Sequence, residues 1–478
     1  MKHDVTFQRD DYDQSLYAWT LADDVVAGQS AVKSKKTVYL PKPNPCDLSV
    51  ENSKRYDQYL ARAVFYNATG RTLQGLVGAA FRKDPSLDVP SVLDYVSEDI
   101  DGAGISIYQQ SQSALRGVLK KGRHALLVDY PQVEGQATRA DMVSGRLRST
   151  VVSIRPEQIV NWRTKKVGAE HKLSLIVICE SVEEPTEDGF GVDVIEQYRV
   201  LRLETSYTQE IWRKNGKDKW VLYQEPVVIL DGTGRAWDEI PITFIGSNNN
   251  DSTIDPSPMY DMAEINIAHY RNSADYEDSA YFVGQAQPWM AGLTEEWRDW
   301  MEKNGVYVGS RSPVLLPEGG QYGIAQAQPN TLVREAMQDK EQQLISLGAR
   351  LVQPGTAVKT ATQSQGEQEA EHSVLSLACS NVSDAYTKVL SWMARFMAAN
   401  DAVEYQIQQD FVEQRLDAQM LTALVGAWQS GKYPESDLWD QLKKYGLIDP
   451  EKDDEAIREE LDTQDQGLDL DGDIPAVN

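Results

Sequence analysis

Apolar residues recur three and four positions apart in the first part of the chain, which is the spacing of one face of a helix. This spacing predicts a helix over about residues 53–81, with its apolar positions at Tyr56, Tyr59, Leu60, Ala63, Val64 and Leu73. Two more helices are predicted within residues 89–121, and Gly122 follows the second as a C-terminal glycine. The run HALLVDYP, from His124, predicts a buried strand. Residues 1–50 end in the turn-rich YLPKPNPCD and predict an extended arm with short elements.

The pattern changes to β-branched and aromatic runs between residues 150 and 245, where Gly, Pro, Asn and Asp separate one run from the next. Examples are HKLSLIVICESVEE, VIEQYRVLRLE and KWVLYQEPVVILDG. The pair Asn215-Gly216 favours a tight hairpin between two of these runs. This region therefore predicts a mostly antiparallel sheet of about six strands.

A long helix with a narrow apolar stripe is predicted from residue 255 to about 282. Ser257 is its expected cap and Pro258 its first residue. The stripe consists of Tyr260, Ala263, Ile267, Tyr270, Ala274 and Tyr281, and Glu277 interrupts it. The flanks are polar, with Asn266, His269, Arg271, Asn272, Asp275 and Asp278. Such a helix packs along one line and stays mostly in water.

The rest of the chain predicts mainly helices around one polar segment. A compact insert holds the helix LTEEWRDWMEKNG and two short strands around a Ser-Arg-Ser-Pro turn. An amphipathic helix is predicted over about 331–350, and a long helix begins near His372. Between them, residues 353–371 are almost free of large apolar side chains. Short helices follow from about residue 401, and the tail from Asp449 is strongly acidic.

Composition and charge narrow the class of protein. The chain has 478 residues, 41% hydrophobic and 25% charged, which is typical of a globular protein of the α+β class predicted by these elements. Its net charge of −26 argues against tight binding of nucleic acid, because that affinity comes mostly from Lys and Arg. No run of about 18 apolar residues exists, and the first residues lack the apolar run of a secretory signal. We expect Cys46, Cys179 and Cys379 to be reduced thiols in the cytosol.

No motif predicts catalysis or a bound cofactor. The chain contains no GxxxxGK[ST] loop, no GxGxxG after a strand and no GxSxG elbow. Its five histidines are scattered without a partner at metal-ligand spacing, and its 73 acidic residues make any single carboxylate pair uninformative. The string DLDGD at 469–473 matches the start of a calcium loop but lacks the later glutamate, so an acidic tail is the better interpretation. We therefore predict no catalytic, cofactor-binding or metal-binding residues.

Several strings, taken in their order, resemble one branch of the portal proteins of tailed bacteriophages. They are RAVFYNATGRTLQGLVGAAFRKDP (62–85), ADYEDSAYF within the polar-flanked helix, VLLPEGG (314–320), and LISLGARLV followed by VKTATQSQ (344–365). Together with the order of elements, the resemblance covers nearly the whole chain. It implies a ring, usually of twelve copies, at one vertex of the capsid, through which double-stranded DNA passes during packaging and ejection.

The resemblance also assigns parts to the chain. It implies a wing (1–254), a first stem helix (255–282), a clip (283–330), a second stem helix (331–352), a tunnel loop (353–371), a spine helix of the wing (372–400), and a crown with the acidic tail (401–478). The residues it singles out are Tyr260, Ile267, His269, Tyr270, Arg271 and Tyr281 in the stem, and Trp297, Trp300 and Arg311 in the clip. In the tunnel loop they are Thr356, Lys359, Thr360, Thr362, Gln363 and Gln365, of which Lys359 is the only basic residue in that segment.

The implied partners are other copies of the chain, the terminase packaging motor, head–tail adaptors, and the major capsid and scaffolding proteins. The implied location is the capsid vertex of the virion, and the host cytoplasm during assembly, with no membrane. Twelve copies at −26 each would carry −312, so DNA would pass without tight binding. Two alternatives stay open: another head-completion or adaptor protein of the virion, and a hydrolase that uses a carboxylate pair.

Overall fold

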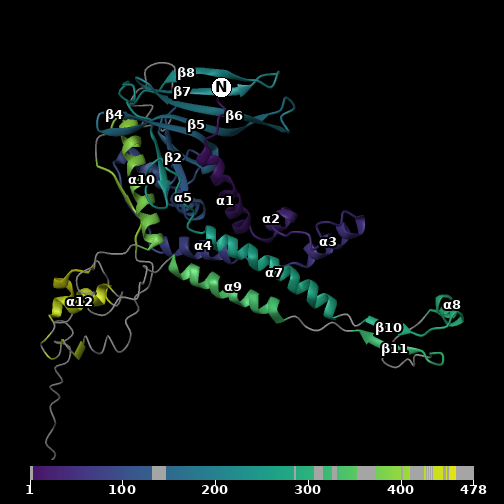
Figure 1. Cartoon of the computed structure of the whole chain (residues 1–478). Helices are drawn as coiled ribbons and strands as arrows, with labels where there is room; N and C mark the ends of the chain where they lie inside the picture. Colours follow the sequence, from purple (N-terminus) through teal and green to yellow (C-terminus); the bar gives the residue numbers. More distant parts are fainter. Residues whose placement is uncertain are drawn as a thin grey trace, which may run out of the picture. The chain divides into compact units, whose positions relative to one another are not determined.

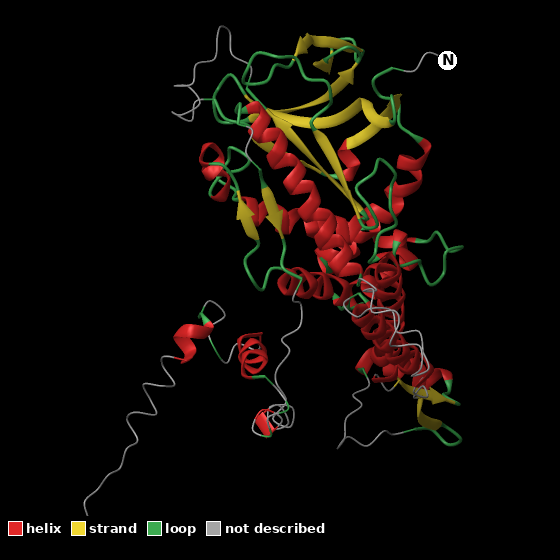
Figure 2. Cartoon of the chain, turned by 90° about the vertical axis from the view of Figure 1, so that its left-hand side faces the viewer, coloured by secondary structure: helices red, strands yellow, loops and turns green. Residues whose placement is uncertain are grey.

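The computed structural model is an α+β protein in which most strands come from residues 123–246 and lie together in antiparallel sheets (Figure 2). It describes residues 4–131, 147–284, 287–305, 316–325, 331–351, 373–399 and 402–409, and several stretches between 425 and 458. The chain forms two compact units, residues 1–409 and 410–478.

The N-terminal region is helical, so the prediction of an extended arm is wrong for most of it. The helices are α1 (Asp10–Ala27), α2 (Gln29–Ser34) and the 3-10 turn η1 (Lys36–Val38). Tyr12, Trp19 and Val25 are buried at helical spacing in α1, and the Trp19 indole donates a hydrogen bond to the Lys121 carbonyl (3.0 Å). The first turn of α1 carries three carboxylates, which interact favourably with the positive end of the helix dipole: Asp10, Asp11 and Asp13. The turn-rich end of the segment concealed this periodicity.

The helical pattern at residues 53–81 forms two helices, α3 (Val50–Arg62) and α4 (Ala68–Ala80). The chain breaks between them because Asn67 caps α4: its side-chain oxygen accepts from the Gly70 amide (2.8 Å). Ser49 caps α3 in the same way, accepting from the Asn52 amide (3.1 Å).

The next segment holds a short strand, a 3-10 helix and one α-helix where two helices were predicted. These elements are β1 (Ser86–Asp88), η2 (Ser91–Ser97) and α5 (Ile107–Lys121). Gly122 ends α5 as predicted, with a left-handed φ of 74°. A side chain there would also clash, since a Cβ on Gly122 would lie 2.3 Å from the Asp255 carbonyl oxygen. The predicted buried strand follows as β2 (Arg123–Asp129).

The strands form two main antiparallel sheets, where one region of about six strands was predicted. A three-stranded sheet has the order β3-β2-β9, with β3 (Thr150–Ile154) and β9 (Ile242–Gly246). A five-stranded sheet runs in sequence order after the 3-10 turn η3 (Pro156–Gln158) through β4 (Ile159–Val167), β5 (Glu170–Pro185), β6 (Val192–Leu203), β7 (Tyr207–Lys214) and β8 (Trp220–Val228). The predicted hairpin at Asn215 is present between β7 and β8, but its turn is longer than two residues: the Asn215 amide donates to the Lys219 carbonyl (2.9 Å).

Two antiparallel helices, α7 (Tyr260–Gly284) and α9 (Thr331–Arg350), pack against one another (Figure 1). The first begins later than predicted, because the Ser257 hydroxyl donates to the Lys120 carbonyl (2.7 Å) and does not cap the helix. The insert between them contains β10 (Gln287–Ala291), α8 (Glu295–Asn304) and β11 (Gln321–Ala325), with β10 paired to β11. The strands predicted around the Ser-Arg-Ser-Pro turn fall mostly in residues that the structure does not describe.

The long helix predicted from near His372 is present as α10 (Val374–Phe396), which packs against β2, β9 and α5. The Ser373 side chain caps it by accepting from the Ser376 amide (3.1 Å). Beyond it, β12 (Glu404–Gln406) pairs with β1, and the Tyr405 hydroxyl bonds to that of Ser111 (2.6 Å). The first compact unit extends to residue 409 and includes β12, which packs against α10. In the second unit, the predicted helix near SDLWDQLKKYG is α12 (Glu435–Lys444).

Candidate functional site

The N-terminal half of α7 lies in a hydrophobic core. Ala263, Ile267, Tyr270 and Ala274 are all buried, which confirms most of the predicted stripe. They pack with residues of α1 and α3 and of the segments beside them: Leu21, Val25, Val32, Tyr39, Leu40, Tyr56, Tyr59, Ala63 and Phe65. Tyr260 at the start of the stripe is half-buried against this cluster. This half of α7 is therefore part of the fold of its own chain.

Two residues assigned to the polar flank, Asn266 and His269, are buried, so that part of the prediction is wrong. The Asn266 side-chain oxygen accepts from the Thr69 amide (3.1 Å) and hydroxyl (3.0 Å). Its amide nitrogen donates to the Tyr66 carbonyl (2.8 Å). Asn266 therefore replaces water for three polar groups where α4 meets α7. The Asn266 side chain is polar because it bonds a residue almost 200 positions away in the sequence, and the periodicity of apolar residues does not reveal such a partner.

His269 lies between the two long helices. Its Nε2 is 3.5 Å from a carboxylate oxygen of Glu341 on α9. Burial lowers the pKa of His269, and the Glu341 carboxylate opposes that shift. The neighbouring Arg271 side chain is anchored differently, since its Nε donates to the Tyr39 carbonyl (2.8 Å).

The C-terminal half of α7 matches the prediction of a helix that stays in water. α3 covers one side: the Tyr59 hydroxyl donates to Asp275 (2.6 Å), and Arg62 pairs with Asp278 (2.5 Å). The Arg62 guanidinium also lies 4.3 Å from the ring centre of Tyr281, which is half exposed. Phe282 is 61% exposed. Apolar surface therefore remains open on this half of the helix.

α9 buries few side chains for a helix of 20 residues. Of its side chains from 331 to 348, which the structure describes, Leu344 is the only one that is buried. Leu332 is 69% exposed and Ile345 is 64% exposed. Most of the stability of a helix in a protein comes from packing of one face. α9 obtains little of it within its own chain.

The segment after α9 begins and ends close together. The chain leaves the described residues after Leu351 and returns at Ser373, and the Leu375 amide donates to the Leu351 carbonyl (3.2 Å). All six residues singled out in 353–371, from Thr356 and Lys359 to Gln365, lie outside the part of the chain that the structure describes.

The insert between the helices carries the tryptophans singled out in the sequence. Trp297 and Trp300 on α8 meet edge to face, with ring centres 5.5 Å apart, and Trp300 remains half exposed. Trp289 on β10 covers Gly323 on β11, where a Cβ would lie 2.7 Å from the indole. The tryptophans thus contact their own insert while keeping open surface. Arg311 lies outside the described ranges.

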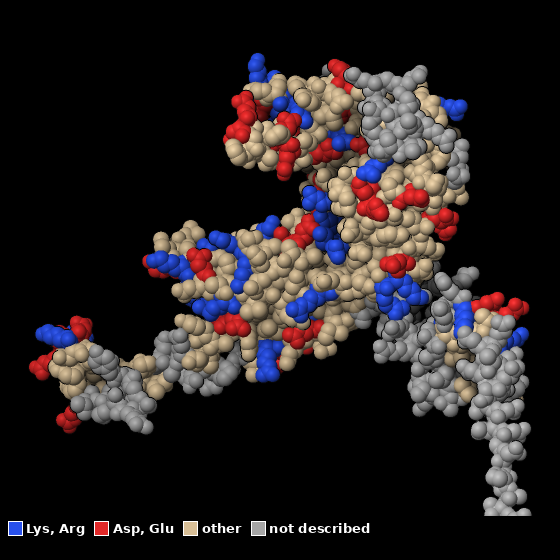
Figure 3. Space-filling view, turned by 180° about the vertical axis from the view of Figure 1, so that it is seen from behind, with Lys and Arg blue, Asp and Glu red and all other residues tan. Residues whose placement is uncertain are grey.

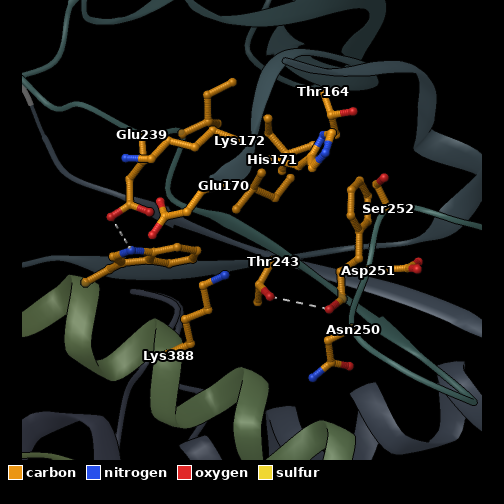
Figure 4. Close-up of a pocket in the computed structure, with 15 residues that line it drawn as sticks. Thr164, Glu170, His171, Lys172, Glu239, Thr243, Asn250, Asp251, Ser252 and Lys388 are labelled. Atoms are coloured by element: carbon orange, nitrogen blue, oxygen red, sulfur yellow. Dashed lines mark hydrogen bonds between the residues drawn. The ribbon is translucent and has the colours of Figure 1, made fainter. Parts of the chain in front are cut away.

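A cavity of about 470 Å³ lies between the β4–β5 hairpin, the start of β9 with the loop after it, and α10 (Figure 4). Its polar residues include Glu170, His171 and Lys172 from the hairpin, Asp251 from the loop after β9, and Lys388 from α10. The Trp392 indole, also in the wall, donates to the Glu239 carboxylate (3.1 Å), which Arg395 approaches at 3.5 Å. Sequence reasoning missed this cavity because its lining comes from distant segments without a shared motif.

Of the cavity carboxylates, Glu239 lies near the Arg395 guanidinium, and Glu170 and Asp251 are exposed to solvent. Among the described residues, no three His, Cys, Asp or Glu side chains gather as metal ligands would. Across the described part of the chain, no helix combines the length and the apolar content that crossing a membrane demands. On the face seen in Figure 3, basic and acidic side chains are interspersed over the coloured residues.

The comparisons give one family match and several structural likenesses. A family model described as a domain of unknown function (DUF4055) matches residues 258–397, from the start of α7 to the end of α10. No curated protein matches the chain. The match covers α7, the insert, α9 and α10 as one block.

Solved structures with some likeness come from particles of a gene transfer agent (GTA). A chain from the neck of an empty GTA particle computed with C6 symmetry is 14% identical, with 80% of this chain and 90% of that chain covered and a TM-score of 0.41. One from the neck of a native GTA particle computed with C12 symmetry is 13% identical, with coverages of 78% and 89% and a TM-score of 0.40. A chain of the virion of the native particle is 15% identical, with coverages of 80% and 87% and a TM-score of 0.38. At TM-scores this low the likeness does not establish a shared fold or role.

Proposed function

We propose that this chain is a portal protein, which forms a closed ring at one vertex of a phage capsid and acts there as the channel for double-stranded DNA. The observation that carries the proposal is the exposure of α9, a helix of 20 residues with Leu344 as the one buried side chain among those described. Burying side chains such as Leu332 and Ile345 contributes about 1.5–3 kcal/mol each. Copies of the chain packed side by side would bury them. Identical head-to-tail contacts either close into a ring or continue as a filament.

The order of parts supports a channel. α7 and α9 are the stem helices and the insert between them is the clip, which docks the packaging motor and later the head–tail adaptors. Residues 353–371 are the tunnel loop. The Leu375–Leu351 hydrogen bond supports this assignment, because a long segment that leaves and rejoins the fold at one place resembles a loop on a rigid base more than a linker.

The net negative charge of the chain favours passage of DNA through the channel over tight binding of the DNA. Twelve copies would carry a large negative charge, and few basic side chains would hold the phosphates. The role is structural and not catalytic, with the capsid and scaffolding proteins as further partners. Exposed Trp289 and Trp300 are suited to anchor a partner at the clip.

Negative-stain microscopy of the purified full-length chain, followed by a packaging assay, tests the proposal. We expect rings with a central hole, and we expect a chain lacking residues 356–369 to form the same rings but to package or retain less DNA. Particles without a hole would contradict the channel. Normal packaging and retention by the shortened chain would remove the tunnel loop's role.

A further inference from the structure

Two glycines on α4 have no purpose within their own chain. Gly75 and Gly78 are exposed, and a Cβ on either would meet no atom within 4 Å. Gly70 on the same helix differs, because a Cβ there would lie 2.6 Å from the Asn67 side chain and 2.9 Å from the Val26 carbonyl. Glycine destabilises a helix interior relative to alanine. The fold therefore explains Gly70 but neither of the other two.

The two glycines belong to one stripe. Arg71, Gly75 and Gly78 are spaced by four and three positions, so they share one face of α4. The opposite face holds the buried Thr69, Leu73 and Leu76, which pack into the chain. This α4 stripe, made of Arg71, Gly75 and Gly78, is thus an exposed surface with small residues beside one basic side chain, on the face opposite the buried residues.

A groove of about 490 Å³ lies between α7 and α9. Its lining is acidic on the α7 side, through Asp261 and Glu264, with Ile265 and Leu347 as apolar residues and Gln343 and Ser346 completing it. The Glu264 carboxylate accepts from the hydroxyls of Tyr260 (3.0 Å) and Tyr17 (3.4 Å), which keeps it at the rim. The groove therefore fits an apolar or small surface flanked by positive charge.

The groove and the stripe of one chain do not meet. α4 packs on its own α7 through Thr69, which bonds Asn266, and on its own α9 through Thr72, which lies beside Gly348. The α4 stripe points away from the contact with α7. The acidic lining of the groove and the basic Arg71 of the stripe have opposite charge, and the two surfaces lie on different elements, as a head-to-tail contact requires.

We propose that the α4 stripe of one copy packs into the α7–α9 groove of the next copy. Gly75 and Gly78 let the helix backbone approach closely, since the distance between packed helices depends on the side chains at the contact. Arg71 then lies beside the acidic rim formed by Asp261 and Glu264. This contact rests on the proposed ring, and it names the surfaces that close it.

Gly78→Leu in the full-length chain tests the contact. The new side chain meets open space in the isolated chain, so folding is retained, but it fills the space that the neighbouring helices need. We expect the protein concentration required for half-maximal ring formation to rise at least about tenfold in native mass spectrometry. Gly216→Leu is the matched control, because Gly216 in the β7–β8 turn also has open space around its Cβ. Rings of Gly78→Leu that form at the wild-type concentration would overturn the contact and leave the proposed ring intact.

A charge exchange separates this contact from a general loss of stability. Arg71→Glu and Asp261→Lys should each weaken ring formation, and the double variant should restore it by at least half, because every interface then carries the exchanged pair. A double variant weaker than both single variants would contradict the pairing. A wild-type chain that stays monomeric at all concentrations would overturn both the contact and the proposed function.

Discussion

Replacing Asn266 by alanine tests whether a buried polar contact anchors α7 to the rest of the chain. The substitution removes three hydrogen bonds, to the Thr69 amide and hydroxyl and to the Tyr66 carbonyl, in a side chain with no measurable exposure. Each such bond contributes about 1 kcal/mol, and a buried polar group left without a partner costs about 1–3 kcal/mol. With three groups affected and some relaxation, we expect Asn266→Ala to lower the free energy of unfolding by about 3–5 kcal/mol.

Urea denaturation of the dissociated chain, followed by tryptophan fluorescence, gives this value, provided that the slope of the transition is unchanged. Asn272→Ala is the control: Asn272 is on the same helix but half exposed, and we expect its effect to stay within about 0.5 kcal/mol. A loss below about 1 kcal/mol for Asn266→Ala would refute the reasoning, because it would mean that water replaces the side chain at no cost.

Three further predictions concern the wing. Burial lowers the pKa of His124 to about 4, so between pH 6.5 and 4 the unfolded chain binds a proton that the folded chain does not, and stability falls as the pH drops. In His124→Gln the urea midpoint should depend less on pH over this range. Arg123 is buried between the rings of Trp162 and Phe244, with no hydrogen-bond acceptor among the described residues, and burial lowers its pKa to about 9. Arg123→Met should therefore raise the free energy of unfolding by about 1–2 kcal/mol. A decrease in the free energy of unfolding of more than about 2 kcal/mol would contradict this prediction. Gly122→Ala should reduce soluble expression several-fold, whereas Gly78→Ala should stabilise the dissociated chain by about 1 kcal/mol, which calorimetry would detect.

Hydrophobic periodicity predicted the order of the main elements because the apolar residues of each long helix recur on one face, which in α7 and α10 packs against the same chain. Ala263, Ile267, Tyr270 and Ala274 show this for α7, and Gly122 shows that a local backbone requirement is also visible in the sequence. The spacing of apolar residues did not separate the strands into two sheets, because the β3-β2-β9 sheet joins segments more than 100 positions apart.

Polar residues were the main source of error at the candidate site. Asn266 and His269 were placed in water because their side chains are polar, but each is buried beside a group from a distant segment, Thr69 or Glu341. α1 was missed for a related reason: its buried Tyr12 lies between Asp11 and Asp13, so carboxylates interrupt the apolar pattern at the start of the helix. The glycines of α4 are visible in the sequence, but only the structure shows that they differ. The fold requires glycine at Gly70 and does not require it at Gly75 or Gly78.

The mass of the assembled particle tests the central claim most directly. Native mass spectrometry of the full-length chain should give one dominant closed species of twelve copies of 53.6 kDa, about 640 kDa, that does not grow with concentration. A chain that remains a monomer or dimer at every concentration and salt would contradict the account, and so would a series of ever longer oligomers without a closed end.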